Sequence, residues 1–269
     1  MRIRHHASLG LAATACLVLS GCTNAADWNA NRSSQIHSFD TSSIQAQPDI
    51  IAKLPQGALE DGVLDVAAST DYAPAEFLDP SGTAVGYDVD LTNAIAAVLG
   101  VKGKVHTAEF DSIIASIGSK YDAGISSFTV TPERTAEVDM TAYINVGSRF
   151  NVQAGNPKGV ETSDHLQLCG RTIGVQVGTA QETTMRDAAD KCAQAGKPVL
   201  SVRSYSKQSE ATTGLVGGTI DATYSDSTVA GYAVELTDGQ IVTLGEVEDA
   251  APQGVVTSKA DPQFTAAIQ

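Results

Sequence analysis

Residues 126–134 read Ser-Ser-Phe-Thr-Val-Thr-Pro-Glu-Arg, and they follow a short apolar run, residues 121–125, that predicts a strand. Thr131 is a candidate N-cap, and the proline after it suits the first helical position because its missing N–H is not needed there. Three hydroxyl groups, the free N–H groups of a helix start and the Arg134 guanidinium would then converge on one region. Helix N-termini attract anions, and arginine pairs with carboxylates bidentately. The stretch indicates a pocket for a small carboxylate, with plain helix capping as the alternative.

The composition limits the classes of partner. The chain has 269 residues and is 42% hydrophobic, which is enough for one large core or two smaller ones. Its formal charge is −14, and it has no basic stripe that could neutralise phosphates, so we expect no nucleic-acid partner. Acidity of this kind mainly gives a solvated, soluble surface.

The N-terminus has the features of a targeting segment. Residues 1–4 carry two arginines, and residues 9–19 form an apolar run too short to span a bilayer as a mature helix. The tetrapeptide Leu-Ser-Gly-Cys at residues 19–22 matches the bacterial lipobox, in which the cysteine is lipidated. We therefore expect a lipoprotein signal peptide over residues 1–21 and a lipid anchor on Cys22. No later stretch has the length of a transmembrane helix, so the lipid is the expected membrane attachment.

The cysteines fit an exported protein. Cys16 falls in the expected signal peptide and Cys22 would carry the lipid, which leaves Cys169 and Cys192 as a pair. An oxidising exterior favours a disulfide between them, and a loop of this length predicts a stabilisation of about 3 kcal/mol. A metal site would need further ligands, and only His165 lies nearby, so we expect no metal.

The rest of the chain divides into a tether and two α/β units. Residues 22–57 are rich in polar residues, lack periodicity and predict a flexible tether. From there on, strand-like runs alternate with amphipathic helices, one of which we expect Asp88 to cap, and this predicts a mainly parallel sheet. Ligands bind such sheets at the carboxyl ends of strands, where the loops that contain Tyr72, Phe110 and residues 126–131 lie.

A second unit repeats this pattern after an expected crossing near residues 140–155. We expect a first lobe over residues 58–150, with a return segment over 251–269, and a second lobe over 151–250. Within the second lobe, we expect a strand over residues 240–244, before the return segment. Two α/β units joined in this way predict a ligand cleft between them.

Four motifs occur in order from about Gly62 to the end of the chain. They are Tyr72-Ala73-Pro74 with Glu76-Phe77, Gly86-Tyr87-Asp88-Val89-Asp90-Leu91, Thr129-Val130-Thr131-Pro132-Glu133-Arg134, and Ile173-Gly174-Val175-Gln176-Val177-Gly178-Thr179. This set resembles the family 3 extracellular solute-binding proteins, the receptors of polar amino acid ABC importers. The resemblance implies an α/β, two-lobed periplasmic-binding-protein fold of type II. Each lobe would be a mainly parallel sheet flanked by helices, with the ligand in the cleft between the lobes. The cysteine pair resembles a subgroup of actinobacterial lipoproteins.

The resemblance also implies roles for the zwitterion anchors. Arg134 would grip the ligand α-carboxylate, with help from the Thr129 hydroxyl and from Thr179 with its neighbouring N–H groups in the second lobe. Asp226 would pair with the α-ammonium, and a backbone carbonyl at Ser127 would assist. A positive and a negative anchor from opposite lobes would make closure of the cleft depend on a zwitterion. Capping of the following helix is the alternative for Asp226.

Further residues would flank the ligand side chain. Tyr72 and Phe110 would contact it directly, with ordinary core packing as the alternative. Nearby positions would hold Gln181, Ser69 and Ser126, and for Gln181 the alternative is helix capping. Receptors for cationic amino acids place an acid near Ser69. The serine therefore favours a neutral polar ligand such as glutamine, unless an arginine at 149 or 203 reaches the cleft.

Two departures from the family pattern stand out. The usual aromatic residue between Pro74 and Glu76 is Ala75, which would open one wall of the entrance. The sequence also ends at Gln269, whereas relatives continue for a further helix or two that pack on the first lobe.

The expected protein is an extracytoplasmic, lipid-anchored monomer of the Gram-positive type that needs no cofactor and passes a small amino acid to an ABC permease. Two alternatives share the fold. Some dehydratases of small carboxylic acids have it, and Asp226 and Glu76 could supply acid–base chemistry, although no histidine lies in a ligand loop. The second alternative is a lipoprotein that senses a ligand and does not transport it, since one fold can serve several functions.

Overall fold

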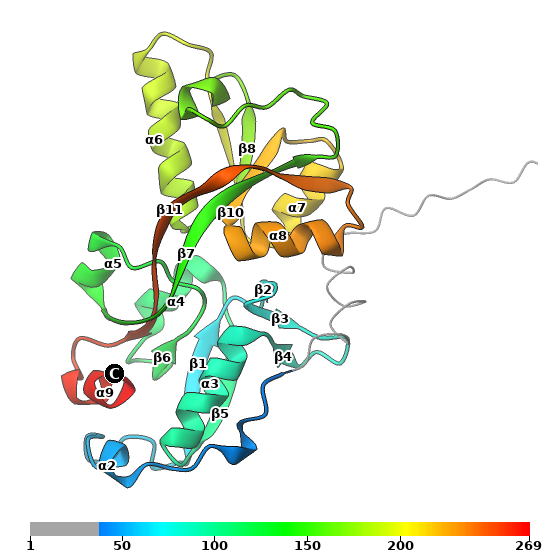
Figure 1. Ribbon diagram of the computed structural model, residues 1–269. Coiled ribbons are helices and arrows are strands. Elements are labelled where there is room, and N and C mark those ends of the chain that lie inside the picture. The colour runs from blue at the N-terminus through cyan, green and yellow to red at the C-terminus, as the bar shows by residue number, and fades with distance from the viewer. Residues whose placement is uncertain (1–37) are drawn as a thin grey trace, which may run out of the picture.

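The computed structural model describes residues 38–269, and Figure 1 shows two lobes joined by a pair of long strands. One eight-stranded sheet runs through both lobes in the order β5-β1-β6-β11-β7-β10-β8-β9. Within this described part, no helix combines the length and hydropathy needed to cross a membrane. The predicted signal peptide, the lipidation of Cys22 and the first part of the predicted tether fall on residues 1–37 and lie outside the described residues.

The first lobe contains three parallel strands, whose bounds are Val63–Ala68 (β1), Lys102–Thr107 (β5) and Ala123–Gly124 (β6). Its helices are Tyr87–Val98 (α3), Phe110–Ser116 (α4) and Pro132–Glu137 (α5). A small antiparallel sheet beside them contains Asp71–Tyr72 (β2), Glu76–Leu78 (β3) and Ala84–Val85 (β4). The alternation of strands and helices expected from the sequence is therefore present.

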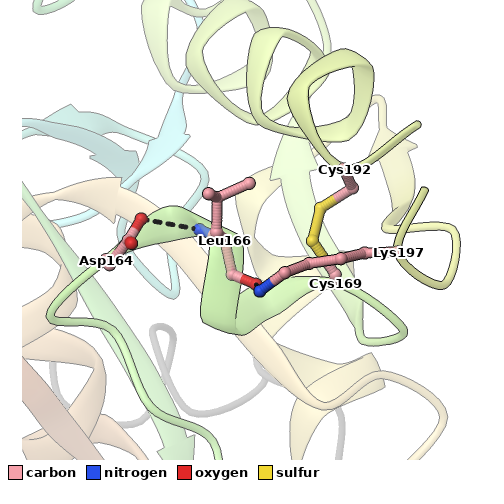
Figure 2. Close-up of a disulfide and its surroundings, with 5 residues drawn as sticks. All are labelled: Asp164, Leu166, Cys169, Cys192 and Lys197. Atoms are coloured by element: carbon pink, nitrogen blue, oxygen red, sulfur yellow. Dashed lines mark hydrogen bonds between the residues drawn. A yellow bond between two sulfur atoms is a disulfide. The ribbon is translucent and has the colours of Figure 1, made fainter. Parts of the chain in front are cut away.

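The second lobe repeats the arrangement. Its parallel strands are Thr172–Gln176 (β8), Ser201–Tyr205 (β9) and Ala222–Asp226 (β10). Its helices are Ala180–Gln194 (α6), Gln208–Val216 (α7) and Ser227–Leu236 (α8), with a short 3-10 helix, His165–Leu168 (η3). The predicted disulfide is present, and Figure 2 shows Cys169, just after η3, bonded to Cys192 on α6.

Two long antiparallel strands, Asp139–Gln153 (β7) and Ile241–Thr257 (β11), connect the lobes (Figure 1). β11 pairs with β6 in the first lobe, and β7 pairs with β10 in the second. The sequence predicts a crossing near residues 140–155, a short strand at 240–244 and a return segment from residue 251. In the structure the crossing is part of β7, and the other two stretches are parts of β11. Irregularities in the pairing of β11 with β7 accommodate the loop-forming residues, so both strands are continuous.

Each lobe has its own apolar core. The first-lobe cluster includes Leu64, Val66 and Ile125 and receives Phe264 from the C-terminal helix Pro262–Ile268 (α9), so the return segment packs on the first lobe as expected. The second-lobe cluster includes Phe150, Leu168, Ile173, Met185 and Cys192. Separate cores let each lobe keep its shape while the two strands between them act as the connection.

Part of the predicted tether packs on the first lobe. Residues 38–57 contain a 3-10 helix, Thr41–Ser43 (η2), and a short helix, Pro48–Ile51 (α2). The Gln47 N–H donates to the Val98 carbonyl at 2.9 Å, and Leu54 packs against the first-lobe core. These residues therefore lie with the lobe and not with the tether, because their scattered apolar side chains find a surface there.

The start of α3 differs from the expected one. Gly86, with a φ of 120°, occupies the N-cap position, and a Cβ there would lie 2.3 Å from the Ala75 carbonyl oxygen, so only glycine fits. The prediction that Asp88 caps this helix is wrong. Asp88 lies inside the first turn, is buried and accepts hydrogen bonds from a distant segment, as described below.

Candidate ligand-binding site

A small cavity lies between the lobes, and its lining comes from both of them. Eight of the ten predicted ligand-binding residues line it, together with Ala180. The first lobe contributes Tyr72, Phe110, Ser127, Thr129 and Arg134, and the second lobe contributes Thr179, Gln181 and Asp226.

Arg134 is fixed on both sides of this cavity. It lies in the first turn of α5, whose N-cap is Thr131 as predicted, because the Arg134 N–H donates to the Thr131 hydroxyl at 3.3 Å. Its Nη1 donates to the Thr129 carbonyl at 2.7 Å, and its Nη2 donates across the cleft to the Gly178 carbonyl at 3.0 Å. Burial lowers the pKa of this guanidinium, although arginine remains charged at physiological pH. The cavity therefore has a fixed positive charge.

Two aromatic rings support the guanidinium. Its central carbon lies 5.5 Å from the ring centre of Phe110 and 5.4 Å from that of Phe128. The two rings stack with their centres 4.7 Å apart. Phe110 thus combines both of its proposed roles, since it packs in the first-lobe core and also lines the cavity.

The N-terminus of α6 faces the cavity from the second lobe. Thr179 is its N-cap: the hydroxyl accepts from the Glu182 N–H at 3.1 Å and donates to the Gln176 carbonyl at 2.7 Å. The hydroxyl is thus used by α6 and by the end of β8, and the N–H groups of Ala180 and Gln181 are the donors that the start of α6 offers to the cavity. A helix start opposite an arginine favours an anion between them.

Asp226 ends β10 and brings a carboxylate to the same cavity. It is 4% exposed, and its oxygens accept from Gln181 Nε2 at 2.8 Å and Gln253 Nε2 at 2.7 Å. Its side chain makes no capping hydrogen bond to α8, so the capping alternative does not describe it. Burial raises the pKa of this carboxyl to about 7, against the hydrogen bonds from both amides.

Gln181 and Tyr72 both contact this carboxylate residue. The Gln181 amide bonds to Asp226 and to the Ser148 hydroxyl at 2.8 Å, so it does not cap α6. The Tyr72 hydroxyl accepts from the Asp226 N–H at 3.2 Å, while its ring packs with Ala75 and a valine of α8. Tyr72 therefore joins the lobes as well as lining the cavity.

Asp88 holds Ser127 in an unusual conformation. Ser127 has a φ of 51°, which is uncommon for a residue other than glycine. Its N–H and hydroxyl donate to Asp88 Oδ2 at 2.7 and 3.2 Å, and the Tyr143 hydroxyl donates to the other oxygen at 2.7 Å. Burial raises the pKa of Asp88 to about 6. These bonds stabilise the turn at the edge of the cavity.

Ser69 and Ser126 do not line the cavity. The Ser69 N–H donates to the Ser126 hydroxyl at 2.9 Å, which donates to Glu76 Oε1 at 2.5 Å. Gln176 of the second lobe donates to the Ser69 hydroxyl at 3.1 Å. The two serines thus belong to a buried hydrogen-bonded chain next to the cavity. Neither this chain nor the part played by Gln253 is predicted by the sequence.

The sequence does not determine whether Arg149 or Arg203 reaches the cleft, and in the structure both bind other groups. Arg149 Nε donates to the Gly245 carbonyl at 3.0 Å, and Arg203 lies over the Tyr205 ring at 5.4 Å. Neither lines the cavity, so Arg134 is its only lining cation among the described residues. Over the same residues, no cluster of side chains has the makeup of a metal site.

This fold and this cavity agree with the comparisons to known proteins. Residues 64–269 match the bacterial extracellular solute-binding proteins, family 3, and the chain belongs to that family. It is 31% identical to the arginine-binding protein ArgT of Corynebacterium glutamicum over 98% of this chain and 85% of the relative.

Solved structures of amino acid-binding proteins share the two-lobed architecture. An ancestral arginine-binding protein bound to glutamine has a TM-score of 0.68 and 30% identity, covering 77% of this chain and 90% of that one. The ancestral amino acid-binding protein AncCDT-1, a precursor of cyclohexadienyl dehydratase, has a TM-score of 0.69 and 29% identity, covering 78% and 88%.

Proposed function

We propose that this protein is an extracytoplasmic receptor that captures a polar L-amino acid between its lobes and delivers it to an ABC permease. The observation that carries the proposal is one cavity with Arg134 on one lobe and Asp226 on the other. The ligand carboxylate lies between Arg134 and the start of α6, and its ammonium lies against Asp226. Because the anchors come from opposite lobes, only a molecule with both charges draws the lobes together.

The lining of the cavity bears on the ligand side chain. Asp226 is the one acid among the described lining residues, and it forms the ion pair with the ligand ammonium. Glu76 and Asp88 are buried and do not line the cavity, so a cationic ligand side chain meets no carboxylate other than Asp226 there. This favours a neutral polar amino acid such as glutamine. The arginine-binding relative supports arginine instead, while the glutamine-bound ancestral arginine-binding protein indicates that one such frame accepts both.

The setting of the receptor follows from the sequence. A lipobox with Cys22, a signal peptide over residues 1–21 and a tether support a lipid-anchored monomer on the outer face of the cell membrane. The description of the family as extracellular agrees with this location.

A second candidate, a small-carboxylate dehydratase, is favoured by one observation: a solved relative is a precursor of cyclohexadienyl dehydratase. Asp226 is the acid–base group that such chemistry would use, and its pKa near 7 suits proton transfer. A receptor returns its ligand unchanged, so NMR of a recovered ligand separates the two functions.

Calorimetry with modified glutamines tests the anchors. The account predicts that L-glutamine or L-arginine binds, whereas glutamine lacking its charged carboxylate (the α-amide) and N-acetylglutamine do not. Asp226→Asn should abolish binding. Asp221→Asn is the matched control, since Asp221 directly precedes the same strand, accepts a hydrogen bond from the Thr172 N–H and forms an ion pair with Lys158. Equal binding of the modified and unmodified ligands would contradict the proposal.

A further inference from the structure

Gln253 lies on β11 where this strand passes between the lobes. Its backbone forms an antiparallel bridge with Thr129. On either side, the Val130 N–H donates to the Pro252 carbonyl at 2.8 Å, and the Gly254 N–H donates to the Phe128 carbonyl at 2.9 Å. The Gln253 backbone is therefore fixed to the segment whose Thr129 carbonyl receives Arg134.

The Gln253 side chain is buried and turned toward Asp226. The residue is 1% exposed, and Nε2 donates to Asp226 Oδ2 at 2.7 Å. The amide oxygen, Oε1, has no hydrogen-bond partner among residues 38–269. Turning the amide over would place two acceptors against each other, so the charge of Asp226 selects this orientation. The amide thus serves the carboxylate and leaves its own acceptor unpaired.

Two amides divide the Asp226 carboxylate between them. Gln181, on the helix that begins at the cavity, donates to Oδ1, and Gln253, on the connecting strand, donates to Oδ2. A carboxylate has about four acceptor positions, so both oxygens can still accept from a ligand ammonium. One donor per oxygen fixes the plane of the carboxylate that faces the cavity.

We propose that Gln253 is a positioning residue for amino-acid capture, which orients the Asp226 carboxylate toward the ligand ammonium and ties it to the Thr129 segment that holds Arg134. The inference rests on the proposed function and extends it. Because Gln253 belongs to the strand that joins the lobes, it keeps the two anchors in register when the cleft is closed.

The positioning role of Gln253 can be recognised from the pKa of Asp226. Burial raises the pKa of Asp226 to about 7, and the hydrogen bond from Gln253 opposes that rise. The titratable and charged groups that face Asp226 in the described protein are Tyr72, Glu76 and Arg134. Removal of the Gln253 donor should therefore raise the pKa of Asp226 further, whereas a purely structural role would leave it unchanged.

The experiment compares Gln253→Met with wild type in the full chain. Gln153→Met is the matched control, because Gln153 also lies on a connecting strand but donates to a backbone carbonyl, that of Val216, at 3.0 Å. Calorimetry from pH 5 to 9 with L-glutamine and with L-arginine gives the dissociation constants. Carbon NMR of the aspartate carboxyl groups, assigned with Asp226→Asn, gives the pKa of Asp226 without any ligand.

For Gln253→Met we expect at least about a tenfold weaker affinity at pH 7. We also expect the Asp226 pKa, and with it the pH below which affinity declines, to move up by about one pH unit. Gln153→Met should change neither quantity. If Gln253→Met does not fold, Gln253→Asn, which keeps an amide but is one methylene shorter, replaces it with the same expectation.

An unchanged Asp226 pKa in a folded Gln253 variant overturns the inference, as does an unchanged affinity. A loss of affinity equal to that of Gln153→Met also overturns it, since the effect is then general to the connecting strands. If wild type binds neither amino acid at any pH, the proposed function fails, and the role of Gln253 in ligand capture fails with it. The ligand-free NMR measurement separates this case from one in which the hydrogen bond to Asp226 has no effect.

Discussion

Asp71 of the first lobe accepts two hydrogen bonds from Ser209 of the second lobe, at 3.1 Å from the N–H group and 2.6 Å from the hydroxyl. Ser209 lies in the first turn of α7, whose N-cap residue, Lys207, makes no side-chain capping bond. A carboxylate from one lobe thus satisfies the start of a helix in the other. This contact exists only where the lobes meet, so it stabilises the closed arrangement.

Removing this contact should weaken ligand retention. For Asp71→Ala we expect the dissociation constant for an amino acid ligand to rise several-fold, mainly through faster release, because the closed state loses two hydrogen bonds. Stopped-flow fluorescence measures the release rate. In a double-mutant cycle with Ser209→Ala, the effects should be non-additive by about 1 kcal/mol. Additive effects would show that the two residues do not act together.

Stability should decrease as the pH rises. Burial raises the pKa of four carboxyl groups: to about 6 for Asp71 and Asp88, to about 7 for Asp226, and upward for Glu76. A raised pKa in the folded state means that the native protein binds more protons than the unfolded chain. The resulting stability is complete near pH 4 and is lost as the pH passes through 6 and 7. Urea unfolding should give a free energy several kcal/mol higher at pH 5 than at pH 8.

Two variants sharpen this measurement. Glu76→Gln removes one buried carboxyl and should flatten the dependence on pH, while Glu133→Gln changes an exposed carboxyl and should leave it as in wild type. A free energy of unfolding that rises from pH 5 to pH 8 would contradict the account.

Ligand affinity should depend on pH in the opposite direction. The ligand ammonium needs an ionised Asp226, whose pKa is about 7 in the free protein. Below that pH, binding has to release a proton, so the dissociation constant should increase by up to about tenfold per pH unit. Calorimetry in buffers of different ionisation enthalpy measures the number of protons released when the ligand binds. A constant affinity from pH 5 to pH 8 is incompatible with Asp226 as the ammonium anchor.

The disulfide should stabilise the second lobe. Cys169 and Cys192 are separated by 23 residues, and Cys192 is fully buried in the second-lobe core. Reduction should lower the free energy of unfolding by about 3 kcal/mol. Urea unfolding with and without dithiothreitol measures this loss. The double variant Cys169→Ala/Cys192→Ala controls for other effects of the reagent and should give one midpoint under both conditions.

The sequence predicts what local signals determine. Thr131 before a proline and Thr179 after a glycine mark helix starts, and both are N-caps in the structure. The long strands β7 and β11 escape prediction because Gly147 and Pro252 are loop signals, while the hydrogen bonds that override them come from distant residues. A pattern read along the chain does not contain those partners.

The same limit applies within the site. Arg134 is predicted from its motif and Asp226 from the resemblance to the family, and both line the cavity. Asp88 and Gln253 are not, because their partners lie 39 and 27 positions away, at Ser127 and Asp226. Their roles arise from burial beside a polar group, which only the folded structure provides.

A thermal-shift panel of the twenty L-amino acids, with wild type, Arg134→Ala and Arg149→Ala, tests the central claim most directly. Arg149 is the matched control because it also donates to a backbone carbonyl but lies outside the cavity. Ligand at a hundred times its dissociation constant adds about 2.7 kcal/mol of stability, which raises the melting temperature by several degrees. The account predicts this rise with one or a few polar amino acids, its loss in Arg134→Ala and its persistence in Arg149→Ala. A folded wild-type protein that responds to none of the twenty, or an Arg134→Ala variant that responds as wild type does, would contradict it.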